Sequence, residues 1–230
     1  MPKVAVLHTS FVFVTVEPVI TDLITELVPG VELMHFVDSD VLATVVRDQG
    51  ISSSSEARMV HLAQAAEAAG ADVIFSACSS LGPTLDAAQR AVGVPVVKID
   101  EAMAVEAAAF DRIGVLATVP TTLGPTSDLI TARALDAGRQ PQIVQRLCPG
   151  AFDVLMGGDR EEHDRMVAEQ AAELAGEVDV LVLAQASMRR LVGRLEDETG
   201  LRVMSSPRIG VELLAKTVRE QLASTPFPTR

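Results

Sequence analysis

Short apolar runs alternate with longer amphipathic stretches along this chain. The runs are rich in Val, Ile and Leu, lack polar alternation, and lie at 3–9, 71–77, 94–97, 112–118, 178–184 and 201–204. Such runs are typical of parallel strands that helices cover on both faces. Helix-forming stretches lie between or after them, at 55–69, 83–90, 161–175 and 209–222. The alternation predicts an α/β fold with right-handed crossovers.

The strand pattern repeats once at long range. The run from Lys3 resembles the run from Arg112, at an offset of 112 − 3 = 109 residues. The run from Asp72 resembles the run from Asp179, at an offset of 179 − 72 = 107, and 94–97 resembles 201–204 at the same offset. Three ordered matches favour duplicated half-domains over chance similarity between Val-rich strands. We expect one half-domain at 1–108, completed by the C-terminal segment 206–230, and the other at 109–205.

Composition narrows the classes of function. A hydrophobic content of 48% and a mean hydropathy of +0.31 indicate a well-filled core. A net charge of −12, with 3% aromatic residues and no Trp or Tyr, argues against nucleic acid as a partner. No apolar stretch reaches the roughly 18 residues of a membrane span, and no signal peptide precedes the first strand, so we expect a cytoplasmic protein with no membrane partner. No His, Cys and Asp cluster has metal-ligand spacing, so we expect no metal.

The repeat places a thiol in one half opposite an amide in the other. When the runs are aligned at their aspartates, Cys78 falls opposite Gln185. A thiol can become a thiolate base or nucleophile, and a nearby helix start favours the thiolate, whereas an amide does not titrate. The second cysteine, Cys148, lies in a predicted turn too far upstream in the repeat to replace the missing thiol.

Small hydroxyl residues follow several of the predicted strands. Loops at the carboxyl ends of parallel strands carry the chemistry of such sheets, and hydroxyls and helix-start N–H groups suit a carboxylate ligand. The alternative is that these residues only form turns and caps. His8 ends the first strand, where it either contacts substrate or packs structurally, whereas His163 is expected on a solvated helix face. The candidate substrate-binding residues are His8, Thr9, Ser10, Ser79, Ser80, Thr118, Thr121 and Thr122, with Ser187 as a further candidate in the second half.

In this order and at these separations, the motifs resemble the aspartate/glutamate/hydantoin racemase superfamily over nearly the whole chain. The resemblance is carried by the loops at Thr9-Ser10 and Cys78-Ser79-Ser80 and by the strands at 112–118 and 181–185. It implies two pseudo-twofold-related half-domains, each a parallel sheet flanked by helices, with the active site in the cleft between them. It also implies chemistry without a cofactor at a carbon next to a carboxylate, and a homo-oligomer. In two-cysteine members one thiolate removes the α-proton and an opposite thiol returns one; the first maps onto Cys78, and the second is absent at Gln185.

The sequence therefore predicts a racemase or isomerase of a small carboxylate, such as an amino acid or a hydantoin. Cys78 is the expected acid/base or nucleophile, with Gln185 and Ser187 as the catalytic candidates of the second half. Proton transfer on the far side of the substrate is expected from Ser187, His8 or water. A decarboxylase or other carbon–carbon lyase of malonate-type acids is an alternative, although the superfamily's single-cysteine decarboxylases keep the cysteine of the second half. A noncatalytic protein that binds small carboxylates is the remaining alternative.

Overall fold

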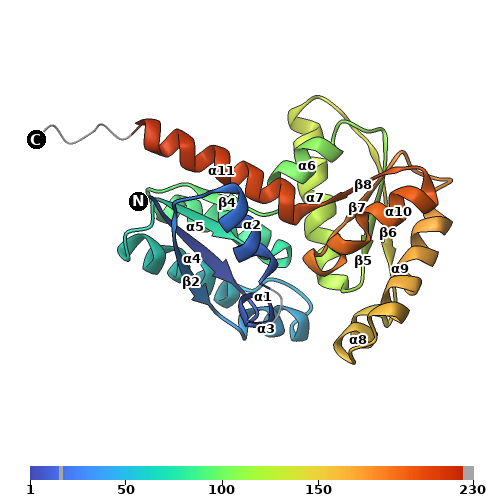
Figure 1. The fold of residues 1–230 in the computed structure, drawn as a ribbon, viewed down its shortest axis with the longest axis horizontal. Helices are drawn as coiled ribbons and strands as arrows, with labels where there is room; N and C mark the ends of the chain where they lie inside the picture. Colours follow the sequence, from blue (N-terminus) through green and yellow to red (C-terminus); the bar gives the residue numbers. More distant parts are fainter. Residues whose placement is uncertain (16–17, 225–230) are drawn as a thin grey trace, which may run out of the picture. The chain divides into compact units, whose positions relative to one another are not determined.

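The computed structural model describes residues 1–15 and 18–224, which form alternating strands and helices (Figure 1). Contacts within the chain divide it into two compact units, Met1–Ile99 with Pro207–Arg230, and Asp100–Ser206. Of the C-terminal segment expected to complete the first half, residues 225–230 lie outside the described part of the chain.

The first unit contains a parallel sheet of four strands in the order β2-β1-β3-β4. Helices lie on both of its faces, as the unbroken apolar runs predict. Its elements are β1 (Lys3–His8), α1 (Val12–Thr15), α2 (Val19–Leu27), β2 (Glu32–Val37), α3 (Val41–Arg47), α4 (Ser53–Ala68), β3 (Val73–Ser76), the 3₁₀ helix η1 (Ser79–Thr84), α5 (Leu85–Ala91), β4 (Val96–Lys98) and α11 (Ser206–Ser224).

The second unit repeats this plan with a parallel sheet in the order β6-β5-β7-β8. Each strand takes the place of its counterpart four strands earlier, which confirms the α/β fold with two half-domains. The elements are α6 (Glu101–Ala107), β5 (Arg112–Ala117), α7 (Pro120–Asp136), β6 (Gln142–Leu147), α8 (Ala151–Met156), α9 (Arg160–Leu174), β7 (Val180–Leu183), the 3₁₀ helix η2 (Ala186–Leu191), α10 (Val192–Thr199) and β8 (Arg202–Ser205).

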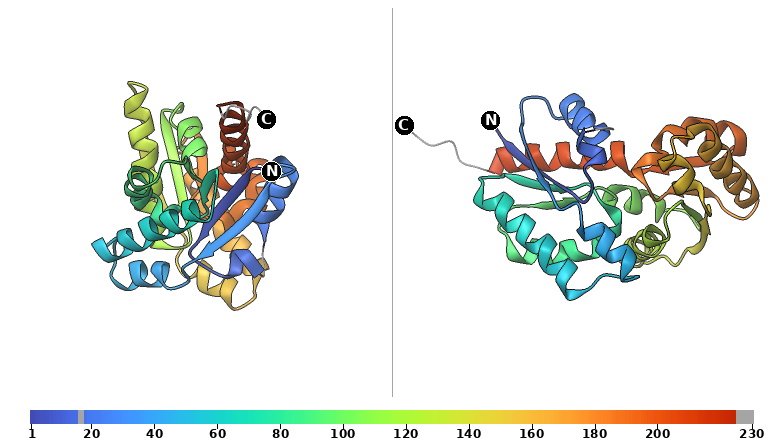
Figure 2. Two further views of the ribbon diagram at one scale, coloured as in Figure 1. Left: turned by 90° about the vertical axis from the view of Figure 1, so that its left-hand side faces the viewer. Right: turned by 90° about the horizontal axis from the view of Figure 1, so that it is seen from below.

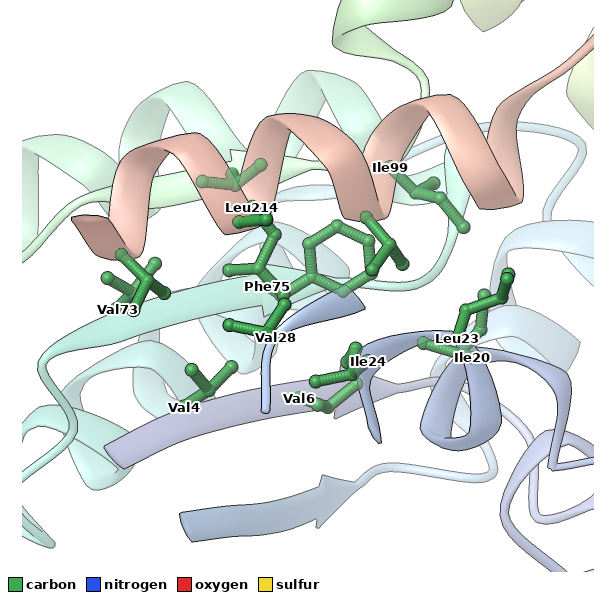
Figure 3. Packing of buried hydrophobic residues seen from close by; sticks show 14 residues of the cluster. Val4, Val6, Ile20, Leu23, Ile24, Val28, Val73, Phe75, Ile99 and Leu214 are labelled. Carbon is green, nitrogen blue, oxygen red and sulfur yellow. The ribbon is translucent and has the colours of Figure 1, made fainter. Parts of the chain in front are cut away.

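Strand alternation sorts the core of the first unit into two layers. Val4 and Val6 of β1 pack with residues of α2 and α11, whereas Ala5 and Leu7 pack with residues of α3, α4 and α5. Figure 2 shows the long α11 helix running beside the strands of this unit. In Figure 3, Leu214 of α11 lies in one apolar cluster with side chains from β1, β3 and α2. The C-terminal helix is therefore part of the core of the first unit.

The boundary between the units lies before α6, earlier than the break expected after residue 108. Helix α6 packs against α7 and β8, which belong to the second unit. Arg133 of α7 also forms an ion pair with Glu101 at the start of α6. This pairing joins α6 to the unit that follows it in sequence.

Candidate active site

Backbone hydrogen bonds set the two halves of the repeat in the same register. The amide of Ala77 donates to the carbonyl of Leu7 over 3.0 Å, and the amide of Ala184 donates to the carbonyl of Leu116 over 2.9 Å. Cys78 is the next residue in the first unit and Gln185 the next in the second. Both have extended backbones, and each directly precedes a 3₁₀ helix. The structure therefore makes Cys78 and Gln185 equivalent positions of the repeat.

The aspartates that anchor the sequence alignment also play equivalent roles. A side-chain oxygen of Asp72 accepts the N–H of Lys3, the first residue of β1, over 2.7 Å. A side-chain oxygen of Asp179 accepts the N–H of Arg112, the first residue of β5, over 3.0 Å. Each aspartate satisfies a backbone donor at the start of a central strand, which fixes the alignment between the halves independently of Cys78 and Gln185.

Cys78 lies at the carboxyl end of β3, next to the end of β1 in the sheet. Its side chain is partly buried and packs against the apolar cluster that includes Leu7, Ile74 and Leu81. The candidate hydroxyl residues of this unit lie at the same edge, because two follow β1 and two begin η1. Thr9 and Ser80 are buried, and Ser10 and Ser79 are partly exposed.

The cations near this edge are already paired with carboxylates. Arg58 of α4 contacts Asp38, which follows β2, through two hydrogen bonds, and also contacts Asp40. Burial is the largest single influence and raises the pKa of Asp38, but the hydrogen bonds from Arg58 and from the backbone N–H groups of Asp40 and Val41, together with the charge of Arg58, outweigh it and hold the pKa below its ordinary value. Lys98 of β4 contacts Asp86 of α5 over 2.6 Å. Both cations are therefore already engaged by carboxylates of their own unit.

His8 contacts a second imidazole, which the sequence analysis did not identify. Its Nε2 lies 3.1 Å from Nδ1 of His35 on the neighbouring strand β2, within hydrogen-bonding distance. His8 is 1% exposed, and its Nδ1 has no hydrogen-bond partner among the described residues. Burial, with a smaller contribution from the charge of His35, lowers the pKa of His8 to about 4. His8 is therefore a neutral imidazole at pH 7.

The side-chain oxygen of Gln185 accepts three hydrogen bonds in the second unit. The donors are the backbone N–H of Thr118 over 2.5 Å, the hydroxyl of Thr118 over 3.1 Å and the backbone N–H of Val119 over 3.3 Å. Two backbone N–H groups require an acceptor, so this network fixes the orientation of the amide. The NH₂ group at the other end of this amide can only donate.

Thr121 and Thr122 lie in the first turn of α7 rather than in a loop, which corrects the sequence interpretation. Helix α7 begins with Pro120, a residue preorganised for the first helical position. The hydroxyl of Thr122 donates to the carbonyl of Val119 over 2.9 Å, so it serves the helix start. Thr118, just before the helix, is 5% exposed and directs its donors to Gln185.

Ser187 lies in η2, two residues after Gln185, and its carbonyl accepts a hydrogen bond from Arg190. Arg190 also contacts Asp164 of α9 over 2.5 Å. The neighbouring His163 is fully buried, so the solvated position expected for it is wrong. Its Nδ1 lies 2.8 Å from a carboxylate oxygen of Asp164 and 3.2 Å from a guanidinium nitrogen of Arg190. These contacts anchor the turn that carries Gln185 and Ser187 to α9.

Cys148 belongs to the core of the second unit. It is 1% exposed and packs in the apolar cluster formed with α9, β7 and α10. Burial raises the pKa of its thiol to about 11, although Arg146 opposes this shift. Within the described residues, no group of three or more His, Cys, Asp or Glu side chains is arranged to hold a metal ion. No described helix is both long enough and apolar enough to span a bilayer.

Comparison with known proteins links this arrangement to racemases. A family model described as Asp/Glu/Hydantoin racemase matches residues 15–214. A glutamate racemase from Bacillus anthracis has a TM-score of 0.74 at 18% identity, covering 96% of this chain and 82% of its own. A glutamate racemase from Francisella tularensis, solved with D-glutamate, has a TM-score of 0.77 at 13% identity, with coverages of 99% and 85%. An allantoin racemase from Klebsiella pneumoniae has a TM-score of 0.64 at 18% identity, with coverages of 97% and 88%. No curated protein sequence matches the chain.

Proposed function

The chain belongs to the Asp/Glu/hydantoin racemase family, and we propose that it is a racemase or isomerase that moves a proton at a carbon next to the carboxylate of a small acid. Its function is of the racemase type, and the family and the racemase neighbours both support an isomerase. The observation that carries the finer proposal is the equivalence of Cys78 and Gln185 in the repeat. One half contributes a group that can exchange a proton, and the other contributes a fixed amide donor.

Cys78 is the proposed acid/base. Its thiolate takes the α-proton, and the electron pair left on carbon delocalises into the neighbouring carboxylate or carbonyl group. The structure supports this assignment over Cys148, because Cys148 is almost fully buried and its pKa is raised to about 11. Thiolates, not thiols, act as bases and nucleophiles, so at pH 7 only Cys78 combines accessibility with a place at a strand end.

Gln185 is the proposed stabiliser of the negative charge that develops on the substrate oxygens. Its carbonyl oxygen already accepts hydrogen bonds from Thr118 and Val119, so the NH₂ group is the part that a substrate oxygen would meet. A donor held in place before the reaction lowers the barrier without further reorganisation. Variants at Cys78 and at Gln185 test the two proposed roles separately.

A small carboxylic acid is the proposed substrate class. The basic side chains Arg58 and Lys98 are paired with aspartates, and the remaining candidates at the strand ends are hydroxyls and an amide. Such donors bind a carboxylate by hydrogen bonds without demanding a second charged group. The glutamate and allantoin racemases among the structural neighbours act on small acids or their cyclic relatives, so amino acids and hydantoins are the first compounds to test.

A carbon–carbon lyase is the second candidate, and the amide at Gln185 favours it. Loss of carbon dioxide from a malonate-type acid leaves a carbanion that needs only one proton donor, and Cys78 alone supplies one. Racemisation needs a second donor on the opposite face of the carbon, for which Ser187, His8 and water are the available groups. The two candidates therefore differ in the number of proton-transfer groups that the reaction uses.

Proton NMR in deuterated water separates these functions. Wild type, Cys78→Ala and Cys148→Ala are each incubated with amino acids, hydantoins and substituted malonates. Deuterium gained at the α-carbon without loss of mass, abolished in Cys78→Ala and retained in Cys148→Ala, is the expected result. Loss of carbon dioxide with one deuterium gained selects the lyase. Binding of a carboxylate with no reaction across the panel overturns both and leaves a binding protein.

Alkylation of the thiols gives a substrate-independent control. At pH 7, iodoacetamide is expected to modify Cys78 and spare Cys148, whose thiol is buried with a raised pKa. Small carboxylates that bind near Cys78 should slow its modification. Equal modification of both cysteines would contradict the assigned difference between them.

A further inference from the structure

Two imidazoles form a continuous hydrogen-bonded pair at the edge of the first sheet. His8 ends β1, and His35 lies on β2, which pairs with β1 in parallel register. Their ring nitrogens Nε2 and Nδ1 are 3.1 Å apart, and the ring centroids are 5.2 Å apart at an interplanar angle of 33°. The side chains lie on the same face of the sheet, because His8 alternates with Val4 and Val6 and His35 with Leu33, all of which belong to or pack against one cluster.

The two rings differ in exposure, so the pair leads from solvent into the protein. His35 is exposed, whereas His8 is 1% exposed and its Nδ1 has no partner among the described residues. Loss of water around the ring lowers the pKa of His8 to about 4, and partial loss of water around the ring of His35 lowers its pKa below the ordinary value, so the neutral form of each predominates at pH 7. A neutral imidazole donates through one nitrogen and accepts through the other. The hydrogen bond between them therefore leaves one open nitrogen at each end, on exposed His35 and on buried His8.

His8 also lies on the opposite side of the sheet from the proposed base. Cys78 packs against the cluster of Leu7 and Ile74, whereas His8 follows the face of Val4 and Val6. The two side chains nevertheless leave the ends of neighbouring strands, β1 and β3, at one edge. Cys78 and His8 are thus separate groups, one to take a proton on one side of this edge and one to give a proton on the other.

We infer that His35 and His8 form a two-imidazole proton relay that connects solvent with the site of Cys78, an inference that rests on the proposed proton-transfer function. His8 is the second proton-transfer group of the reaction, in place of the thiol that Gln185 replaces. His35 is a positioning and relay residue, because it touches His8 and not the substrate.

The relay moves one proton without leaving a net charge on either ring. In the starting tautomers His35 donates from Nδ1 to Nε2 of His8, and Nδ1 of His8 carries a proton. Three proton transfers occur together: the Nδ1 proton of His8 passes to the substrate carbanion, the Nδ1 proton of His35 passes to Nε2 of His8, and a hydronium ion or a protonated buffer molecule gives a proton to Nε2 of His35. Both rings end as the opposite neutral tautomer, and abstraction of a proton by His8 in the reverse direction restores the first state.

NMR of the ¹⁵N-histidine-labelled full chain tests the relay without any substrate. The exchange of the ring N–H of His8 with water is measured in wild type, His35→Phe and His35→Gln. Loss of the relay is expected to slow this exchange by about tenfold or more in both variants. His35→Gln can still hydrogen-bond to His8 but cannot pass a proton by changing tautomer, so it separates relay from simple contact. Fully buried His163, in the second unit, serves as the internal reference.

The outcomes distinguish failure of the relay from failure of the proposed function. Unchanged exchange at His8 in both His35 variants overturns the relay, whatever the substrate. Cys78→Ala should abolish turnover yet leave exchange at His8 unchanged. With a substrate in hand, His35→Gln is expected to lower kcat by about 100-fold at little cost in KM, with rescue by added imidazole. A change in KM alone would overturn the relay role and indicate a structural one.

Discussion

At the residue scale, the burial of His8 makes stability depend on pH. Its pKa is about 4 in the folded protein against an ordinary value of 6.5, so between these values the unfolded chain binds more protons. The free energy of unfolding must then fall as the pH drops through this window, by about 3 kcal/mol from this group alone. Below pH 4 the contribution of His8 is already lost.

Urea unfolding of wild type and His8→Gln at pH 7 and at pH 4 tests this prediction. The wild-type loss of stability is expected to exceed that of His8→Gln by about 3 kcal/mol, because only the wild type carries the buried imidazole. His61→Gln, on an exposed position of α4, is the matched control and should retain the wild-type dependence. Identical pH dependence in wild type and His8→Gln would contradict the lowered pKa.

Gln185 allows stability and function to be separated by two substitutions. Gln185→Leu removes the acceptor of the Thr118 and Val119 N–H groups and is expected to cost about 1–3 kcal/mol of unfolding free energy. Gln185→Glu keeps an acceptor near the start of α7, where a negative charge is favourable, so its stability should stay within about 1 kcal/mol of wild type. It has no N–H donor and repels a carboxylate, so turnover should be lost.

Thermal unfolding and the deuterium-exchange assay measure these two effects in parallel. A stable Gln185→Glu variant that keeps wild-type turnover would remove the donor role from Gln185. An unfolded Gln185→Glu variant would instead contradict the arrangement of three donors around one oxygen.

The sequence identifies Cys78 and Gln185 as equivalent, because in both halves of the repeat the residue directly follows an apolar run. It does not identify His35, whose contact with His8 depends on pairing between strands 27 residues apart. It also places His163 in solvent, because the neighbouring charged residues hide the buried face of α9. A residue-by-residue interpretation of the sequence therefore does not predict contacts that depend on strand register or on the rotation of a helix about its axis.

At the element scale, the edge strands β2 and β6 are the strands that sequence patterns missed. Each contains exposed polar residues between half-buried apolar ones, as in Glu32–Val37 and Gln142–Leu147. The central strands β1 and β5 are almost wholly buried and were predicted. Burial on both faces produces the apolar runs on which the prediction depends, and an edge strand lacks part of that cover.

Helix α11 lies so close to the backbone of Ile99 that it requires a glycine at position 210. A Cβ at Gly210 would lie 2.2 Å from the carbonyl oxygen of Ile99, a backbone atom that cannot easily move. Gly210→Ala is therefore expected to lower the free energy of unfolding by about 2 kcal/mol or more, despite the better helix propensity of alanine. Gly193→Ala in α10 is the matched control, because no atom lies within 4 Å of its added Cβ.

Chemical unfolding of the two glycine variants decides the point. Gly193→Ala should raise the free energy of unfolding by about 0.5–1 kcal/mol, since only helix propensity changes. A Gly210→Ala variant as stable as Gly193→Ala would contradict the close approach of α11 to Ile99.

At the scale of the whole molecule, the duplicated sheets give the chain separate apolar cores. The layers of the first unit are built from β1–β4 and their helices, and a further cluster of the second unit surrounds β5, β7 and α9. The repeat in the sequence predicts two half-domains. It does not predict the side on which α6 lies, because its partners in α7 and β8 are chosen by packing and by the Glu101–Arg133 pair.

Separate cores predict that a cavity in one unit weakens mainly that unit. Leu214→Ala removes a fully buried side chain from the core of the first unit, and Leu174→Ala does the same in the second. Each is expected to cost about 2–5 kcal/mol. Hydrogen exchange should show the loss of protection in β1–β4 for Leu214→Ala and in β5–β8 for Leu174→Ala, because each unit can open without the other. Equal loss across both sheets in either variant would show instead that the two units unfold as a single cooperative structure.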